Sequence, residues 1–354
     1  MNSDYLWDRS GEPDPEIQEL ETALAKFRHR DQPLVFPETT EPERKRRGSV
    51  LRGWRFIALA AACVLIAVFG IARLRLQQAV PAPTSWEVAR LSGAPRIGSQ
   101  SIGENNRAAS LAIGQALETD ADSRATITAS AVGEVSVEPN TRLRLLTTTS
   151  PGRQRLALDR GTIRAFIWAP PGEFVVDTSS ARAIDLGCAY TLQVDDSGAG
   201  LLRTTMGWVG FKLGNRESFI PAGAVCPTRP KIGPGTPYFE DAAQSFRAAL
   251  SAFDFAALRP AQRSERLDLI INQARRQDAL TLWHLLLRVD AGDRERVYDR
   301  LRALVPPPPN VTREGILRLD QPMLDDWWSE LGFGDISLWR RFERSWSQSA
   351  PRAE

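Results

Sequence analysis

The pattern of hydrophobic and polar positions divides the chain into four parts of different texture. Residues 56–72 form an uncharged run of 17 positions, and the residues before it are mostly polar. Between about 84 and 232, short alternating or β-branched runs recur between Gly, Asp, Asn and Pro residues, which predicts an all-β domain. After that, apolar residues follow the 3.6-residue spacing of helices. The predicted parts are therefore residues 1–53, 54–75, 84–232 and 238–354.

The uncharged run predicts one transmembrane helix over residues 54–75. Seventeen residues at 1.5 Å each cover about 25 Å, slightly less than the roughly 30 Å hydrocarbon core. Trp54, Arg55 and Arg73 stand at its ends, where such side chains reach the membrane interface. A buried core helix is disfavoured by apolarity on every face. A cleaved signal peptide is disfavoured by the length of the chain that precedes the run.

Basic residues near this span are more frequent before it than after it, which predicts the orientation. By the positive-inside rule, residues 1–53 are cytoplasmic and the chain beyond about 76 lies outside. The same basic cluster is therefore interpreted as a topology signal beside the lipid bilayer, and no direct nucleic-acid partner is expected. The residues before the span are Arg44, Lys45, Arg46, Arg47, Arg52 and Arg55, and those after it are Arg73 and Arg75.

The first 53 residues contain one helix signal. Asp14, Pro15 and Glu16 supply an N-cap, a proline at the first helical position and an acid in the first turn. Apolar residues then recur on one face, and another apolar cluster precedes the cap. Tethered beneath a membrane, this pattern predicts a partner-docking element, with a self-associating hairpin or adhesion to the membrane surface as alternatives. The candidate partner-binding residues are Tyr5, Leu6, Trp7, Ile17, Leu20, Leu24 and Phe27.

The last 117 residues predict a small α-helical bundle. The segment Leu280–Val289 is apolar nearly all round, which is typical of a buried central helix and too short for a second span. His284 on this helix is interpreted as a core or edge histidine. The helical spacing of Trp327 and Trp328 favours core packing over a sugar-stacking platform, whereas Trp339 and Trp346, near several arginines, are assigned to the surface.

The composition of the chain limits the classes of chemical function that it can have. Charged residues make up 25% of the chain and apolar residues 42%, and Lys+Arg 45 against Asp+Glu 43 leaves a net charge of +2. Three cysteines and two histidines are too few for a disulfide-built fold or a multi-histidine metal site. The sequence lacks a Gly-x-Ser-x-Gly elbow, a P-loop and a His-Glu-x-x-His motif. We expect no enzymatic activity, no cofactor and no metal.

Five segments of the predicted β domain resemble the FecR domain of bacterial transmembrane sigma-factor regulators, in order and over about 145 residues from 86 to 230. They are residues 111–146, 156–168, 174–194, 204–211 and 220–230. The positions that match the family pattern are Gly114-Gln115, Thr119, Gly161, Thr178, Leu186-Gly187, Gly207 and Ala222-Gly223. The chain departs from it at Cys188, where the family usually has Thr, at Tyr190, where it has Phe, and at Ala224, where it often has Glu.

This resemblance implies an envelope-facing sandwich or solenoid-like β module joined to a cytoplasmic segment that binds a sigma factor. It implies no catalytic residue. The chain is thus expected to be a single-pass signalling regulator of the anti-sigma type in the bacterial inner membrane, with its C-terminus in the periplasm. The alternative is a membrane-anchored envelope scaffold that binds a protein or polysaccharide and has no sigma-factor partner.

The three cysteines fall in two predicted compartments. Cys63 lies within the span, whereas Cys188 and Cys226 both lie outside, where disulfides persist. Cys188 follows Leu186-Gly187 at the start of an expected strand, and Cys226 follows Ala222-Gly223 at the closing strand of the same domain. We therefore expect a Cys188–Cys226 disulfide, the alternative being two buried thiols that each fill a small core position.

Overall fold

The computed structural model describes residues 85–104, 107–129, 132–148, 154–334, 336 and 340. The chain divides into two compact units, Met1–Gln78 and Ala79–Glu354, and the described residues belong to the second. The predicted cytoplasmic segment and transmembrane helix lie outside the described residues. Within the described ranges, no helix has both the length and the apolarity needed to cross a membrane.

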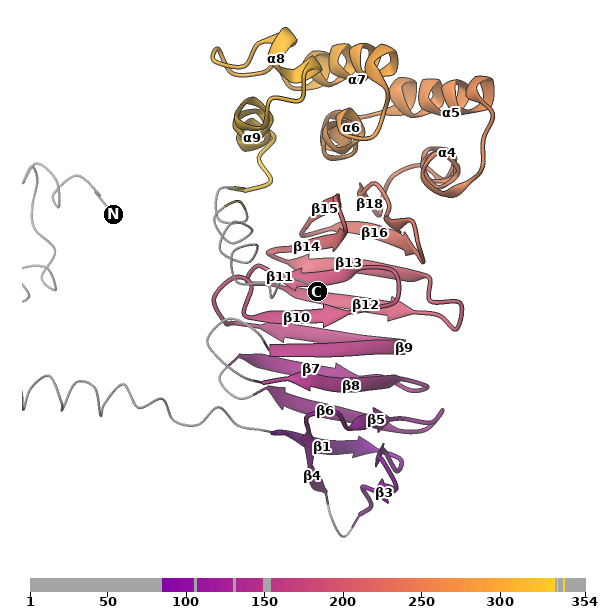
Figure 1. The fold of residues 1–354 in the computed structure, drawn as a ribbon, viewed down its shortest axis with the longest axis vertical. Coiled ribbons are helices and arrows are strands. Elements are labelled where there is room, and N and C mark those ends of the chain that lie inside the picture. Colours follow the sequence, from indigo (N-terminus) through magenta and orange to yellow (C-terminus); the bar gives the residue numbers. More distant parts are fainter. Residues whose placement is uncertain are drawn as a thin grey trace, which may run out of the picture. The chain divides into compact units, whose positions relative to one another are not determined.

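The described strands form two sheets that share one long strand (Figure 1). All pairs are antiparallel except β9 with β10. Sheet A has the order β4 (Ala108–Ala112), β1 (Ser85–Ser92), β6 (Arg124–Ala129), β7 (Gly133–Val137), β9 (Gln154–Ile167), β12 (Ala189–Val194), β13 (Gly200–Met206) and β16 (Ala224–Arg229), and β16 also pairs with β17 (Gly233–Pro234) and β18 (Tyr238–Phe239). Sheet B has the order β3 (Gln100–Ser101), β2 (Arg96–Ile97), β5 (Ala116–Glu118), β8 (Arg142–Thr147), β9, β10 (Phe174–Asp177), β11 (Arg182–Asp185), β14 (Trp208–Leu213) and β15 (Arg216–Pro221).

Alternating side chains explain why these segments form a two-layered core. In β6, Ala125, Ile127 and Ala129 are buried while the residues between them are more exposed. The buried side chains of both sheets belong to one continuous hydrophobic core. Trp86 of sheet A stacks on Phe174 of sheet B, with ring centroids 6.3 Å apart. This architecture confirms the predicted all-β region.

A glycine marks the point where β9 passes from sheet B to sheet A. Residues 154–160 of β9 pair within sheet B, and residues 161–167 pair within sheet A. Gly161 has φ +94°, and a Cβ there would lie 2.4 Å from Thr141 Cα, so only glycine fits. The Thr141 hydroxyl accepts a hydrogen bond from Thr162 N at 2.9 Å, which fixes the next residue.

The helices follow the strands in sequence, as the texture change predicts. They are α4 (Gln244–Phe255), α5 (Pro260–Gln273), the 3-10 turn η2 (Arg276–Asp278), α6 (Ala279–Leu286), α7 (Ala291–Leu304), α8 (Arg313–Leu317) and α9 (Gln321–Glu330). Every residue of α6 is buried, which confirms a buried central helix, although it ends at Leu286 rather than Val289. Trp327 and Trp328 are 0% exposed, which confirms core packing for this pair.

The helices also cover the last strand of sheet B, and they lie at one end of the stacked strands (Figure 1). Phe219 N in β15 donates a hydrogen bond of 3.0 Å to His284 Nε2 in α6. Arg288 donates to the carbonyl of Glu217 at 2.8 Å and to the hydroxyl of Ser218 at 2.7 Å. Backbone groups that an edge strand would expose are therefore paired with side chains of α6 and of the turn after it.

A buried ion network strengthens this junction. Asp254 of α4 is 2% exposed and pairs with Arg216 of β15 at 2.9 Å and with Arg288 at 3.7 Å. It also accepts a hydrogen bond of 2.6 Å from Thr236 N. Charges from strand β15, from helix α4 and from the turn after α6 thus meet in one buried group, so the strand region and the helices pack as a continuous body.

Candidate functional site

Several large apolar side chains are exposed on the outer side of sheet A. In β9, Ile163, Ala165 and Ile167 point into the core, so Arg164, Phe166 and the following Trp168 point outward. Phe166 is 50% exposed and Trp168 is 55% exposed. Their rings meet edge to face with centroids 5.8 Å apart.

Register brings a third apolar side chain to the same row of the sheet. Phe166 lies opposite Glu134 on β7 and opposite Ala189 on β12, and Ala189 lies opposite Met206 on β13. Met206 is 49% exposed. We call Phe166, Trp168 and Met206 the outer patch.

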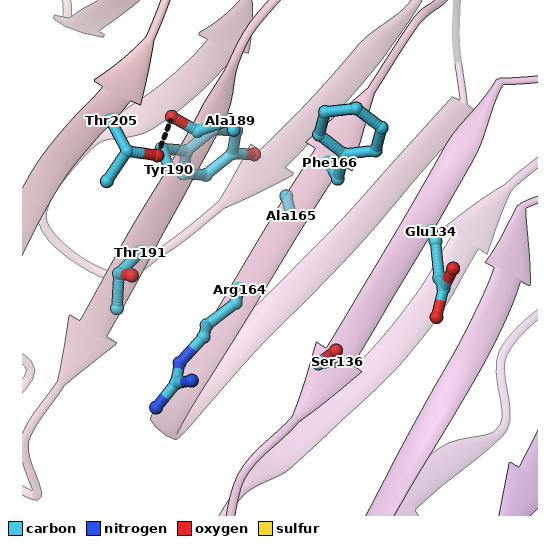
Figure 2. Close-up of a pocket in the computed structure, with 9 residues that line it drawn as sticks. All are labelled: Glu134, Ser136, Arg164, Ala165, Phe166, Ala189, Tyr190, Thr191 and Thr205. Atoms are coloured by element: carbon cyan, nitrogen blue, oxygen red, sulfur yellow. Dashed lines mark hydrogen bonds between the residues drawn. The ribbon is translucent and has the colours of Figure 1, made fainter. Parts of the chain in front are cut away.

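Polar side chains adjoin the outer patch in the next row of the sheet. Arg164 of β9 lies opposite Ser136 on β7 and opposite Thr191 on β12. These residues, with Glu134 and Phe166, line a shallow hollow of about 510 Å³ (Figure 2). Arg164 also pairs with Glu138 at 3.3 Å, which holds its guanidinium over the sheet.

A bulge in β13 shapes the far side of the hollow. The register between β12 and β13 shifts between Ala189 and Tyr190, and the hydroxyl of Thr205 donates to the Ala189 carbonyl at 3.0 Å (Figure 2). Exposed aromatic, Met and Arg side chains in one place are typical of protein–protein contact surfaces. The described residues that line the hollow include no histidine or cysteine. The exposed side chains of the outer patch and of the hollow are therefore suited to contact with a protein surface.

His284 has a structural position rather than a place in this hollow. It is 1% exposed, and its Nδ1 lies 2.8 Å from the Leu280 carbonyl while Nε2 accepts from Phe219 N. Burial, and secondarily the nearby Arg288 charge, lowers the pKa of His284 to about 3. The ring is therefore neutral at pH 7, with its proton assigned to Nδ1. This agrees with its interpretation as a core histidine.

The predicted Cys188–Cys226 disulfide is wrong, because both residues are free buried thiols. Cys188 donates to an Asp185 carboxylate oxygen, and Cys226 donates to the Gly235 carbonyl at 3.1 Å. On neighbouring strands, Cys226 of β16 lies opposite Leu202 of β13, and Leu202 lies opposite Leu192 of β12. Cys188 immediately precedes β12 and is four residues before Leu192 in the chain. Two strand spacings and four residues separate the Cα atoms by about 16 Å, too far for a disulfide. The alternative of two core thiols is the one observed.

The other candidate residues on the sequence lie outside the described residues. They are Tyr5, Leu6, Trp7, Ile17, Leu20, Leu24 and Phe27. The outer patch is the feature that the sequence interpretation missed. Its signal is present in β9, where apolar residues occupy both alternating faces and Arg164 shares the face of Phe166 and Trp168. Within the described ranges, no three His, Cys, Asp or Glu side chains lie close enough to hold a metal ion.

Comparisons with known proteins identify the β region. Residues 115–206 match the family model described as FecR protein, and the outer patch lies within the matched segment. A protein from Parabacteroides distasonis ATCC 8503, described as a "putative anti-sigma factor", has crystal structures at 1.65 and 2.50 Å resolution. Each is 16% identical to this chain with a TM-score of 0.32, and the alignment covers 38% of this chain and 64% of that one. No curated protein matches the chain.

Proposed function

We propose that this chain, which carries a FecR domain, is a single-pass membrane regulator that couples a signal in the bacterial envelope to a cytoplasmic sigma factor. The observation that carries the proposal is the FecR match over residues 115–206, which supports a sigma-factor regulatory role. The uncharged run of residues 56–72 supports the membrane anchor. In this proposal the bacterial inner membrane separates the two activities, with the FecR domain in the periplasm.

The cytoplasmic half of the proposed mechanism is a docking helix. Leu20 and Leu24 lie on the apolar face of the expected helix, and a free apolar helix face binds a hydrophobic groove of a partner. We propose that the sigma factor supplies that groove. The docked helix then holds the sigma factor inactive, as expected of the anti-sigma type.

The envelope half of the proposed mechanism is the outer patch. Three apolar side chains at about half exposure, beside hydrogen-bonding groups, provide a surface that an envelope protein can cover. In this proposal the role is one of binding alone, without catalysis or a cofactor. A polysaccharide ligand at the same patch belongs to the alternative function, a membrane-anchored envelope scaffold.

A transcriptional experiment separates these two functions. Strains of the source bacterium would carry Leu20→Asp/Leu24→Asp in the chromosomal gene, and their transcripts would be compared with those of the wild type. Release of an inhibited sigma factor should raise one group of promoters severalfold. The matched control is Gln18→Asp/Thr22→Asp, which places the same charges on the opposite helix face. Identical transcription in all strains would favour the scaffold.

A further inference from the structure

A buried carboxyl group lies at the corner where β11 leaves sheet B and β12 begins in sheet A. Asp185 is 1% exposed. One carboxylate oxygen accepts from Gly187 N at 2.7 Å, and the other accepts from the Cys188 thiol. Among the described residues, no lysine, arginine or histidine forms an ion pair with Asp185.

The groups around Asp185 provide no positive charge. On β12, Tyr190 is 2% exposed, and its hydroxyl has no hydrogen-bond partner among the described atoms. On β14, the residue opposite Asp185 is Val209, and Gly172 N–H in the loop before β10 donates to the Asp185 backbone carbonyl at 2.7 Å. Cys188 and Tyr190 are therefore the titratable side chains that face this carboxyl. Both are positions at which the chain departs from the FecR pattern.

A negative charge in these surroundings is costly. Transfer of an ionised carboxylate into a buried site without a cation disfavours the charged form. Burial raises the pKa of Asp185 to about 7, although the Cys188 thiol and the backbone N–H groups of Gly187 and Cys188 act in the opposite direction. Below about pH 7, the neutral acid is thus the form that the folded domain prefers.

The location gives this preference a structural consequence. The corner at Gly187 packs so closely on Gly207 that a Cβ at Gly207 would lie 2.1 Å from the Gly187 carbonyl oxygen. Ala189, in the row of the outer patch, follows two residues after Gly187. A change that loosens the corner therefore acts directly beside the candidate binding surface.

We propose that Asp185, Cys188 and Tyr190 form a proton-dependent latch, which holds this corner closed while Asp185 is neutral and loosens it when Asp185 ionises. The latch is a property of the FecR domain itself. It does not depend on the identity, or the existence, of a sigma-factor partner.

The direction of the pH effect follows from linkage. The folded domain holds the proton up to about pH 7, whereas the unfolded or opened segment releases it near the ordinary value of 3.8. The stabilisation is therefore complete below about pH 4 and is lost as the pH rises to about 7. Within that window, Asp185 alone increases the opening equilibrium constant about tenfold per pH unit.

Hydrogen exchange of the full-length protein tests the latch. After correction for intrinsic exchange rates, amides near residues 185–190 of the wild type should open about fiftyfold more at pH 7 than at pH 5, because half of the folded molecules have lost the proton at the upper pH. Asp185→Asn should remove this increase. The matched control is Asp159→Asn, because Asp159 is partly exposed on β9 and paired with Arg144, so it should keep the wild-type increase. A wild type without the increase, or an Asp185→Asn variant that retains it, would overturn the proposal.

A second variant keeps the test decisive if Asp185→Asn does not fold. Cys188→Ala removes the thiol hydrogen bond that stabilises the carboxylate, so the pKa of Asp185 should rise further. The pH range over which the corner opens should then move upward relative to the wild type. A variant that opens over an unchanged pH range would also contradict the latch.

Discussion

At the scale of single residues, exposure decides what each aromatic side chain contributes. Phe166 is 50% exposed, whereas Phe174 is 0% exposed and stacks on Trp86 in the core. The same substitution at the two positions should therefore have opposite consequences for stability and binding. This contrast provides a direct test of the outer patch.

We predict that Phe166→Ser and Trp168→Ser together change the free energy of unfolding, relative to the wild type, by no more than about 0.5 kcal/mol per substitution, as is usual for surface positions. Phe174→Ser should cost at least about 3 kcal/mol, because it leaves a cavity and a buried hydroxyl. Urea denaturation of the full-length protein measures both. A large loss of stability in the patch variant would show that these rings are structural and would remove the case for a contact surface.

Residues also show how far sequence reasoning reaches. The burial of Trp327 and Trp328 follows from helical spacing, which is a local pattern. The separation of Cys188 from Cys226 depends on the register of β12, β13 and β16, which no local pattern specifies. The Asp185 cluster likewise depends on how two sheets meet at a corner. The outer patch could have been predicted from the sequence, because alternation in β9 alone places Phe166 and Trp168 on the same face as Arg164.

At the scale of elements, the junction between β15 and the helices holds the two regions together. The texture of the sequence predicts strands followed by helices, and the structure confirms both. The sequence texture could not predict that α6 and the residues after it pair with the free edge of sheet B. That contact links Phe219 to His284 across 65 positions, and such long-range pairing is set by the packed structure as a whole.

We predict that Arg288→Ala destabilises the protein by about 3–5 kcal/mol, the usual cost when one partner of a buried ion pair is removed. Arg288 has a 6% exposed side chain and bonds Glu217, Ser218 and Thr236, all of which would lose a donor. Arg318→Ala is the control, because its pair with Glu314 is exposed and should contribute less than 1 kcal/mol. Thermal unfolding that is equal for the two variants would contradict a stabilising role for the network.

At the scale of the whole molecule, the proposed function requires the chain to cross a membrane once. We predict that alkaline phosphatase is active when fused after residue 232 and inactive when fused near residue 45. The enzyme folds only outside the cytoplasm, because its disulfides need an oxidising compartment. The reverse pattern would contradict the regulator and the scaffold together, since both place the FecR domain in the envelope.

The central claim is that the cytoplasmic segment binds a sigma factor, and affinity capture with the tagged full-length protein tests it most directly. Mass spectrometry of material captured from detergent-solubilised cells of the source bacterium should identify one sigma factor with the wild type. The Gln18→Asp/Thr22→Asp variant should capture it equally, whereas Leu20→Asp/Leu24→Asp should capture at least tenfold less. No sigma factor with the wild type, or equal recovery with all three proteins, would contradict the account.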